Sequence, residues 1–189
     1  GPWLFDVDGR RYVDLFCNGL SLIHGNNYGP TRAAIQGALA NGSAWSGASR
    51  VQIEFAEMLC RRIAVLELVR FANSGSEAAM LAVKAARQFT GRNYIVKAVG
   101  AYHGSYPDLE AGLYGQGDLA GRTLGGPFND LAAFERIMAQ HGSEVAAVIV
   151  EPVLVTGRVM APAPGFLAGL QELARRHGAV RGAMLRMVE

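Results

Sequence analysis

Short apolar segments alternate with helical patterns along the chain from residue 68 onward. The apolar segments are residues 68–72, 94–99 and 145–150, and the helical patterns are residues 77–90, 129–141 and 164–177. Strands that alternate with helices predict a parallel sheet. The segment Val145–Val150 contains no polar residue, which is typical of a strand that helices cover on both faces. We therefore expect an α/β fold with a mostly parallel sheet and helices on both of its faces.

The rest of the chain follows other patterns. Asp6–Asp14 places apolar residues on either side of an Asp-Gly pair, which predicts a β-hairpin. Glycines and asparagines predict a loop at 18–29, and helical periodicity predicts helices at 31–41 and 50–64. Residues 104–127 contain seven glycines and show little periodicity, so we expect a long, mobile loop there.

Composition and charge exclude several classes of protein. Half of the 189 residues are hydrophobic and only 18% are charged, which argues against disorder. A net charge of +2 does not favour a nucleic-acid partner, and no apolar run approaches the roughly 18 residues of a membrane span. Cys17 and Cys60 lack redox or metal-ligand spacing, and His24 and His141 have no ligand-spaced partners, so we expect reduced thiols and no metal site. No secretory signal is visible at the start, and we expect a cytoplasmic protein.

The turn Asn73–Ser76 stands between a predicted strand and a predicted helix. A helix N-terminus presents unpaired N–H groups and a partial positive charge, which suit a phosphate group. Gly75 would allow a ligand to approach the backbone, and Ser74 and Ser76 offer hydroxyl groups. The spacing supports equally well a purely structural interpretation, in which Ser76 is the N-cap and Glu77 lies in the favourable first turn.

Two further polar positions follow predicted strands. Tyr102 and His103 come just after the strand at 94–99, and Glu151 comes directly after the strand at 145–150. Open α/β sheets bind ligands at the carboxyl ends of their strands. There Tyr102 could stack on a planar cofactor, His103 could donate a hydrogen bond, and Glu151 could pair with a cation or cap a neighbouring backbone group. A packed aromatic and a histidine with satisfied hydrogen bonds are the structural alternative.

Several motifs occur in one order along the chain, and together they resemble the class III aminotransferases. The motifs are Leu4–Gly9, Tyr12–Asp14, Val69–Ala78, Phe89–Arg92, Gly100–Gly104, Pro127–Asp130, Val148–Val153 and Pro164–Leu167. The chain is most similar to the branch of this family that contains glutamate-1-semialdehyde aminomutase, and the resemblance runs from residue 3 to about residue 179.

The resemblance implies a fold, a cofactor and a set of site residues. It implies the large domain of a fold-type I pyridoxal-phosphate enzyme, with residues 1–45 as an N-terminal segment, residues 46–179 as part of the large domain and residues 180–189 as a non-matching tail. By the same resemblance Gly75 and Ser76, with Ser74 beside them, hold the phosphate of pyridoxal 5'-phosphate. Tyr102 stacks on the cofactor ring, His103 lies against it, and Glu151 and Thr156 lie near the ring or the substrate. The family acts as a homodimer on a small-molecule amino donor and a carbonyl acceptor.

The sequence also departs from the family pattern. The Asp that pairs with the pyridinium nitrogen and the Schiff-base lysine follow position 180 in the family and are absent here, and neither Lys84 nor Lys97 occupies the catalytic position. We therefore expect a truncated chain without a catalytic residue, which is inactive by itself, folds poorly or aggregates, and does not hold the cofactor. The resemblance also implies that the strands flanking Phe71 belong to the missing part, so the strand at 68–72 should have no neighbours and the strand at 145–150 should expose an unpaired edge. Gly19 and Thr156 replace a Trp and an Asn of the aminomutase branch, which favours transamination over aminomutase activity.

Three hypotheses remain open at this point. The first is a fragment of a pyridoxal-phosphate enzyme, with transamination expected and aminomutase, racemase or decarboxylase chemistry possible on the same scaffold. The second is a non-catalytic truncated paralogue. The third is an unrelated phosphate- or nucleotide-binding module, which rests only on the helix N-terminus at residues 73–76.

Overall fold

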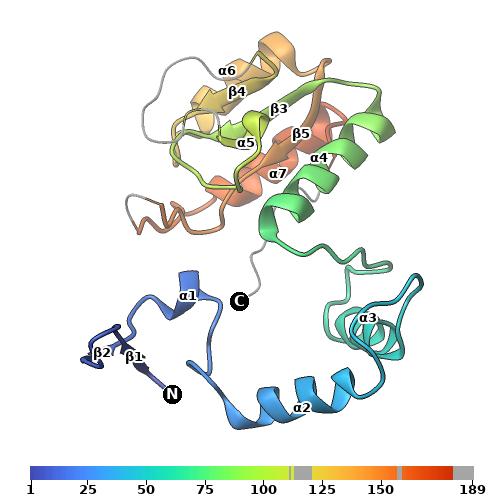
Figure 1. Cartoon of the computed structure of the whole chain (residues 1–189). Helices are drawn as coiled ribbons and strands as arrows, with labels where there is room; N and C mark the ends of the chain where they lie inside the picture. Colours follow the sequence, from blue (N-terminus) through green and yellow to red (C-terminus); the bar gives the residue numbers. More distant parts are fainter. Residues whose placement is uncertain (111, 113–120, 157–158, 181–189) are drawn as a thin grey trace. The chain divides into compact units, whose positions relative to one another are not determined.

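The computed structural model describes residues 1–110, 112, 121–156 and 159–180. The chain forms two compact units, one of residues 1–70 and one that begins at Phe71. Figure 1 shows the elements of both units. The domain division expected from the sequence, with boundaries at 45/46 and 179/180, stays a prediction.

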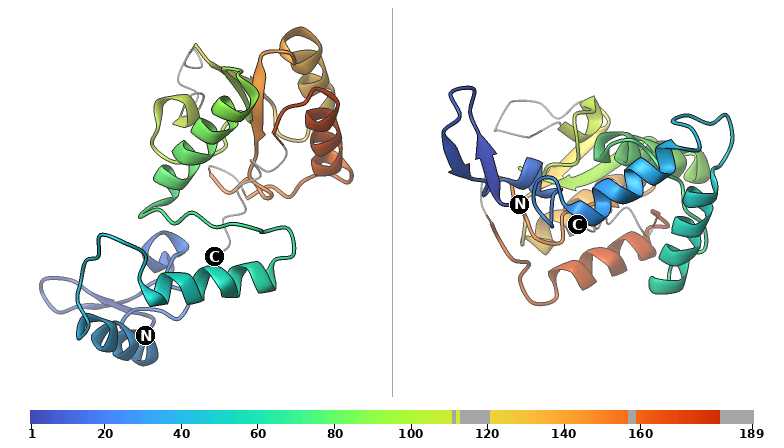
Figure 2. Two further views of the ribbon diagram at one scale, coloured as in Figure 1. Left: turned by 90° about the vertical axis from the view of Figure 1, so that its right-hand side faces the viewer. Right: turned by 60° about the horizontal axis from the view of Figure 1, so that its bottom comes forward.

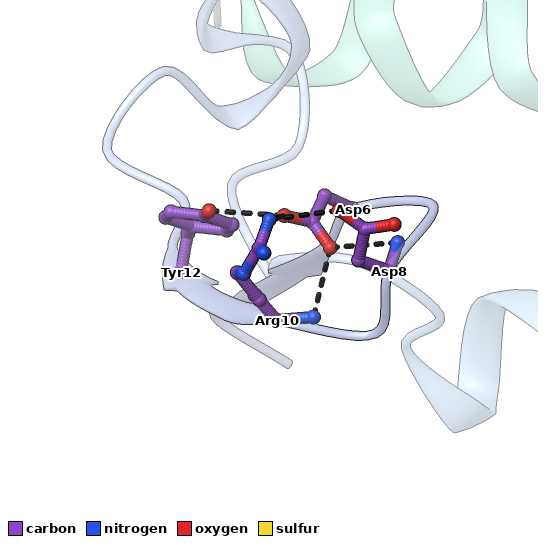
Figure 3. A network of polar contacts seen from close by, with 4 residues as sticks. All are labelled: Asp6, Asp8, Arg10 and Tyr12. Carbon is purple, nitrogen blue, oxygen red and sulfur yellow. Dashed lines mark hydrogen bonds and ion pairs between the residues drawn. The ribbon is translucent and has the colours of Figure 1, made fainter.

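The first unit begins with the predicted hairpin. Strands β1 (Trp3–Phe5) and β2 (Arg11–Val13) are antiparallel, and Trp3 pairs with Val13. The turn between them is organised by the carboxylate of Asp6, which accepts hydrogen bonds from the backbone N–H groups of Asp8 and Arg10 at 3.0 and 2.8 Å and from the Tyr12 hydroxyl at 3.0 Å (Figure 3). These hydrogen bonds, above all that from the Arg10 backbone, lower the pKa of Asp6. The hairpin prediction is confirmed.

Three helices complete the first unit. Helix α1 (Cys17–Leu20) is short and irregular, with Asn18 and Gly19 at positive φ, and it lies partly in the segment predicted as a loop. Helices α2 (Gly29–Leu39) and α3 (Arg50–Arg62) lie within two residues of their predicted bounds. Helix α3 begins at a capping box, in which the Ser49 and Gln52 side chains each accept a hydrogen bond from the other residue's backbone.

The second unit contains a three-stranded parallel sheet in the order β4-β3-β5. Strands β3 (Tyr94–Ala98) and β5 (Val145–Ile149) lie where apolar segments predicted them, and β4 (Thr123–Gly126) pairs with β3 through Ile95 opposite Thr123. The sheet has helices on both faces, as the left view of Figure 2 shows. The expectation of a parallel sheet between two helical layers is confirmed.

The two helical layers bury two separate clusters of apolar side chains. Helices α4 (Gly75–Thr90) and α5 (Pro107–Glu110) cover one face, where Val83 and Leu109 pack with Ile95 of β3. Helices α6 (Leu131–His141) and α7 (Phe166–Arg176) cover the other face, with Phe134, Met138, Phe166 and Leu170 around Val96 and Val148. The starts of α4 and α6 follow from their caps, since Ser74 and Asp130 accept hydrogen bonds from the first turns of these helices.

Two sequence-based predictions of secondary structure are wrong. Residues 68–72 are not a strand, because a strand exists only by pairing and neither sheet of the described residues includes this segment. The lack of neighbouring strands around Phe71 agrees with what the resemblance implies for this chain. The segment 104–127 is not wholly a loop, since it contains α5 and β4. Residues 111 and 113–120 of the predicted mobile loop lie outside the described residues.

The edge of β5 that faces away from β3 is paired at one point. Val180 forms a parallel bridge with Ala147, and its backbone N–H donates to the carbonyl of Ala146 at 2.9 Å. The predicted exposure of this edge is therefore wrong at this position.

Within the described part of the chain, no helix combines the length and the apolar composition that crossing a membrane requires.

Candidate active site at the carboxyl edge of the sheet

The N-cap of α4 is not the residue that the structural interpretation of this turn predicted. Ser74, not Ser76, is the N-cap, and its Oγ accepts a hydrogen bond from the backbone N–H of Glu77 at 3.2 Å. The Glu77 carboxylate in turn accepts from the backbone N–H of Asn73 at 2.6 Å. The capping interaction therefore leaves the side chain of Ser76 available for another contact.

Two backbone donors at this helix N-terminus are unused. The N–H groups of Gly75 and Ser76 have no acceptor among the described residues, as expected for the first positions of a helix. A Cβ atom added at Gly75 would meet no heavy atom within 4 Å. An anion could therefore approach these two N–H groups directly, where the helix dipole also favours negative charge.

The loop after β3 contacts this helix N-terminus. The backbone N–H of Ser105 donates to Ser76 Oγ at 3.0 Å. Gly104 has a φ of +98°, and a Cβ atom at this position would lie 2.5 Å from Ser76 Oγ and 2.6 Å from Ser76 Cα. Only glycine fits such a backbone contact at a positive φ. Sequence reasoning assigned no role to Gly104 or Ser105, although a glycine directly after Tyr102 and His103 is a signal of close backbone approach.

Tyr102 and Glu151 are brought together at the same edge of the sheet. The Tyr102 backbone N–H donates to Glu151 Oε2 at 3.3 Å, and Tyr102 is 38% exposed. Glu151 also accepts a hydrogen bond from the backbone of Val155. Of the roles considered for Glu151, the structure therefore shows the capping of neighbouring backbone groups, while Tyr102 remains partly exposed.

The side chain of His103, in the loop after β3, is buried. Its Nε2 atom has no hydrogen-bond partner among the described residues, so the alternative of a histidine with satisfied hydrogen bonds does not hold for this nitrogen. Burial, with a smaller contribution from the positive charge of Lys97, lowers the pKa of His103 to about 3. The imidazole is therefore neutral at physiological pH and presents an unused nitrogen.

Thr156, His24 and His141 take no part in these hydrogen bonds. Thr156 is half-buried and follows Leu154, which forms an antiparallel bridge with Met160; residues 157–158 lie outside the described residues. His24 stacks on Tyr28 with ring centroids 4.5 Å apart, and His141 lies 3.8 Å from a carboxylate oxygen of Glu144. No group of three His, Cys, Asp or Glu residues in the described ranges could hold a metal ion.

Glu151 makes stability depend on pH. Burial raises its pKa above the ordinary 4.5, against the opposing effect of its two backbone hydrogen bonds. The folded state therefore binds more protons than the unfolded state between these two pKa values, and the free energy of unfolding falls as pH rises through that window. We expect Glu151→Gln to remove this part of the pH dependence, measured by urea unfolding between about pH 4 and about pH 8.

The matched control for this measurement is Glu135→Gln, since Glu135 is exposed on α6. It should leave the pH dependence unchanged. A Glu151→Gln curve that runs parallel to that of the unsubstituted chain across the whole range would contradict the raised pKa.

Comparisons with known proteins agree on one family. The profile of the family Aminotransferase class-III matches residues 1–108. The glutamate-1-semialdehyde 2,1-aminomutase of Myxococcus xanthus (strain DK1622) is 43% identical over 191 aligned positions, which cover 94% of this chain and 44% of the relative.

Two solved structures show the same fold. A transaminase with PLP bound has a TM-score of 0.90 at 33% identity, and an omega-transaminase from Sphaerobacter thermophilus has a TM-score of 0.89 at 35% identity. The alignment covers 95% of this chain and 45% of each of these structures. The chain thus spans less than half the length of the relatives it matches, and the fold of its second unit is that of a pyridoxal-phosphate transferase. With more than half of its residues matched by the family profile, this chain belongs to the class-III aminotransferases.

Proposed function

We propose that the chain is the cofactor-phosphate-binding part of a pyridoxal-phosphate enzyme that transfers an amino group between an amino acid or amine and a keto acid or aldehyde. The observation that carries the proposal is the contact between two elements at the carboxyl edge of the sheet. The N-terminus of α4 offers the unused N–H groups of Gly75 and Ser76, and the loop that bears Tyr102 and His103 lies directly against it.

The residues present fit this cofactor. Its phosphate requires hydrogen-bond donors and a positive potential, which the first turn of α4 supplies, and Ser76 Oγ–H adds a further donor. Its ring requires an apolar surface, which the partly exposed Tyr102 offers, and the neutral His103 has a buried nitrogen without a hydrogen-bond partner among the described residues. These features support Ser74, Gly75, Ser76, Tyr102 and His103 as the cofactor-binding residues.

The chain's own residues bind and orient rather than transfer protons. Pyridoxal phosphate supplies a reactive carbonyl and an electron-withdrawing ring. Gly75 and Ser76 bind the phosphate, and Glu151 fixes the backbone of Tyr102 so that the ring of Tyr102 stays in place. Of the two lysines, Lys97 is fully buried and Lys84 is exposed on α4. We therefore propose that neither of them is catalytic, and that the 189-residue chain alone has no transaminase activity.

The resemblance extends the proposal to the assembly and the substrates. Small-molecule amino donors and carbonyl acceptors are the expected substrates, and a cytoplasmic homodimer is the expected form of the active enzyme. Aminomutase chemistry is the second candidate reaction, because a relative with that name is 43% identical over nearly all of this chain. Gly19 and Thr156 favour transamination.

A chimera tests the proposal. Residues 1–179 would replace the matching part of the Myxococcus xanthus relative, and the chimera should retain pyridoxal phosphate through dialysis. Gly75→Ala should weaken that retention at least about tenfold, because a methyl group enters the space where the phosphate approaches the backbone. The unfolding midpoint of the cofactor-free chimera should not change, since no heavy atom of the chain lies within 4 Å of the added Cβ. Assays with amino donors and with glutamate-1-semialdehyde then distinguish transaminase from aminomutase activity.

Gly37→Ala is the matched control, since Gly37 lies in α2 and a Cβ atom there also meets nothing within 4 Å. It should not affect cofactor retention. Equal retention by the Gly75→Ala and Gly37→Ala chimeras would show that the phosphate binds elsewhere, and a folded chimera without cofactor would refute the proposal.

A further inference from the structure

Lys97 is a buried charged residue to which the proposed function assigns no role. It lies within β3 with an exposed fraction of 0%, between Val96 and Ala98, which are also fully buried. Side chains alternate along a strand, so Lys97 points to the same face of the sheet as Ile95, the face covered by α4 and α5. Complete burial of a lysine is rare and costly unless its ammonium group is bound.

The ammonium group of Lys97 binds the segment that follows the site. Nζ donates a hydrogen bond to the backbone carbonyl of Leu109 in α5. Nearby, the backbone N–H of Gly100 donates to the carbonyl of Gly112 at 3.3 Å. These two contacts join the end of β3 to the region of α5. Tyr102, His103 and Gly104 lie between the two ends of this connection. The hydrogen bond from Lys97 therefore holds together the two ends of the segment that carries the site residues.

Charged groups of the site surround this ammonium. The carboxylates of Glu151 and Glu110 favour its protonated form, whereas burial opposes it more strongly and lowers the pKa of Lys97 to about 8. The positive charge of Lys97 also acts on His103, whose pKa it helps to lower. Lys97 therefore interacts electrostatically with Glu151, which binds the Tyr102 backbone, and with the buried imidazole.

We propose that Lys97 is a positioning residue of the cofactor site: by binding the Leu109 carbonyl, its buried ammonium group fixes residues 101–105 against the first turn of α4. The term cofactor site rests on the proposed function. The hydrogen bond from Lys97 to the Leu109 carbonyl is present without a cofactor, so its effect on residues 101–105 can be measured in this chain alone.

The inference is tested by hydrogen exchange of the full chain at low protein concentration and without cofactor, with mass spectrometry as the readout. Three variants are compared. Lys97→Met removes the ammonium group and keeps the apolar stem. Thr123→Val removes the hydrogen bond that Thr123 Oγ1 donates to the Asp108 carbonyl at 2.6 Å, which also fixes α5 but involves no charge. Lys84→Met removes the other lysine of the chain, which is exposed.

The expected results are local. In Lys97→Met the amides of residues 102–105 should exchange on the order of tenfold faster, while those of β3 and β5 should stay protected. Exchange of the His103 ring C–H, which reports imidazole protonation, should show a higher pKa because a neighbouring positive charge is gone. Thr123→Val should accelerate exchange around residue 108 without changing the His103 titration, and Lys84→Met should change neither.

Two results would overturn the inference. One is Lys97→Met with unchanged exchange at residues 102–105 and an unchanged His103 titration. The other is uniform acceleration over the whole second unit, which would show that Lys97 stabilises the fold in general. Neither readout involves cofactor, so a failure of the chimera to retain pyridoxal phosphate would refute the proposed function without affecting this test.

Discussion

Gly104→Ala is expected to separate the loop after β3 from the first turn of α4 and to abolish cofactor binding by the chimera. At the observed φ of +98° an alanine is strained, and its Cβ would lie 2.6 Å from Ser76 Cα. That atom belongs to the helix backbone and cannot move as the end of a side chain could. Strain at such a position costs about 1–3 kcal/mol, and the overlap adds to it, so we expect a loss of about 3 kcal/mol or more in the free energy of unfolding unless the loop moves away.

A second glycine in the same loop provides the control for this prediction. Gly100 also has a positive φ, +79°, but a Cβ atom there would meet nothing within 4 Å. Gly100→Ala therefore carries the backbone strain without the overlap, at about 1 kcal/mol. Urea unfolding gives the difference between the two variants, and exchange of the Ser105 amide reports its hydrogen bond to Ser76 Oγ. Equal effects of the two substitutions would show that the contact with Ser76 is unimportant.

Arg92→Met is expected to destabilise the second unit by about 2–4 kcal/mol, because hydrogen bonds from a charged group are lost and their acceptors are left unpaired. The Nη1 atom of Arg92 lies within hydrogen-bonding distance of three backbone carbonyls, those of Gly142 at 3.3 Å, Val145 at 3.1 Å and His177 at 2.7 Å. These carbonyls stand just after α6, at the start of β5 and just after α7. One guanidinium group thus connects both helices of one layer to the sheet.

The control for Arg92 is an exposed arginine on the same unit. Arg136 lies on the outer side of α6, and Arg136→Met should change the free energy of unfolding by less than about 0.5 kcal/mol. Both variants should be compared by urea unfolding at neutral pH. A loss for Arg92→Met as small as that of Arg136→Met would show that the three carbonyls find other donors or water at no cost.

The sequence alone predicted the elements whose causes are local. Helix α4 ends at Gly91, which adopts a left-handed conformation with φ of +69° as a C-terminal glycine commonly does. The hairpin at the start follows from its Asp-Gly turn, and β5 follows from an uninterrupted apolar segment. The places of Ser74, Gly75, Ser76, Tyr102 and Glu151 at a helix start and at strand ends were also predicted from periodicity and the family motifs, and their role in binding a cofactor stays a prediction.

Tertiary structure decided the features that depend on residues far apart in the chain. Residues 68–72 have a strand-like composition but no place in either described sheet, while β4 contains two glycines and becomes a strand by pairing with β3. The contact between Gly104 and Ser76, and the burial of Lys97 against the Leu109 carbonyl, likewise join separate elements. Local propensity does not encode such contacts, because backbone pairing and the burial of a charge are set by which segments the fold brings together.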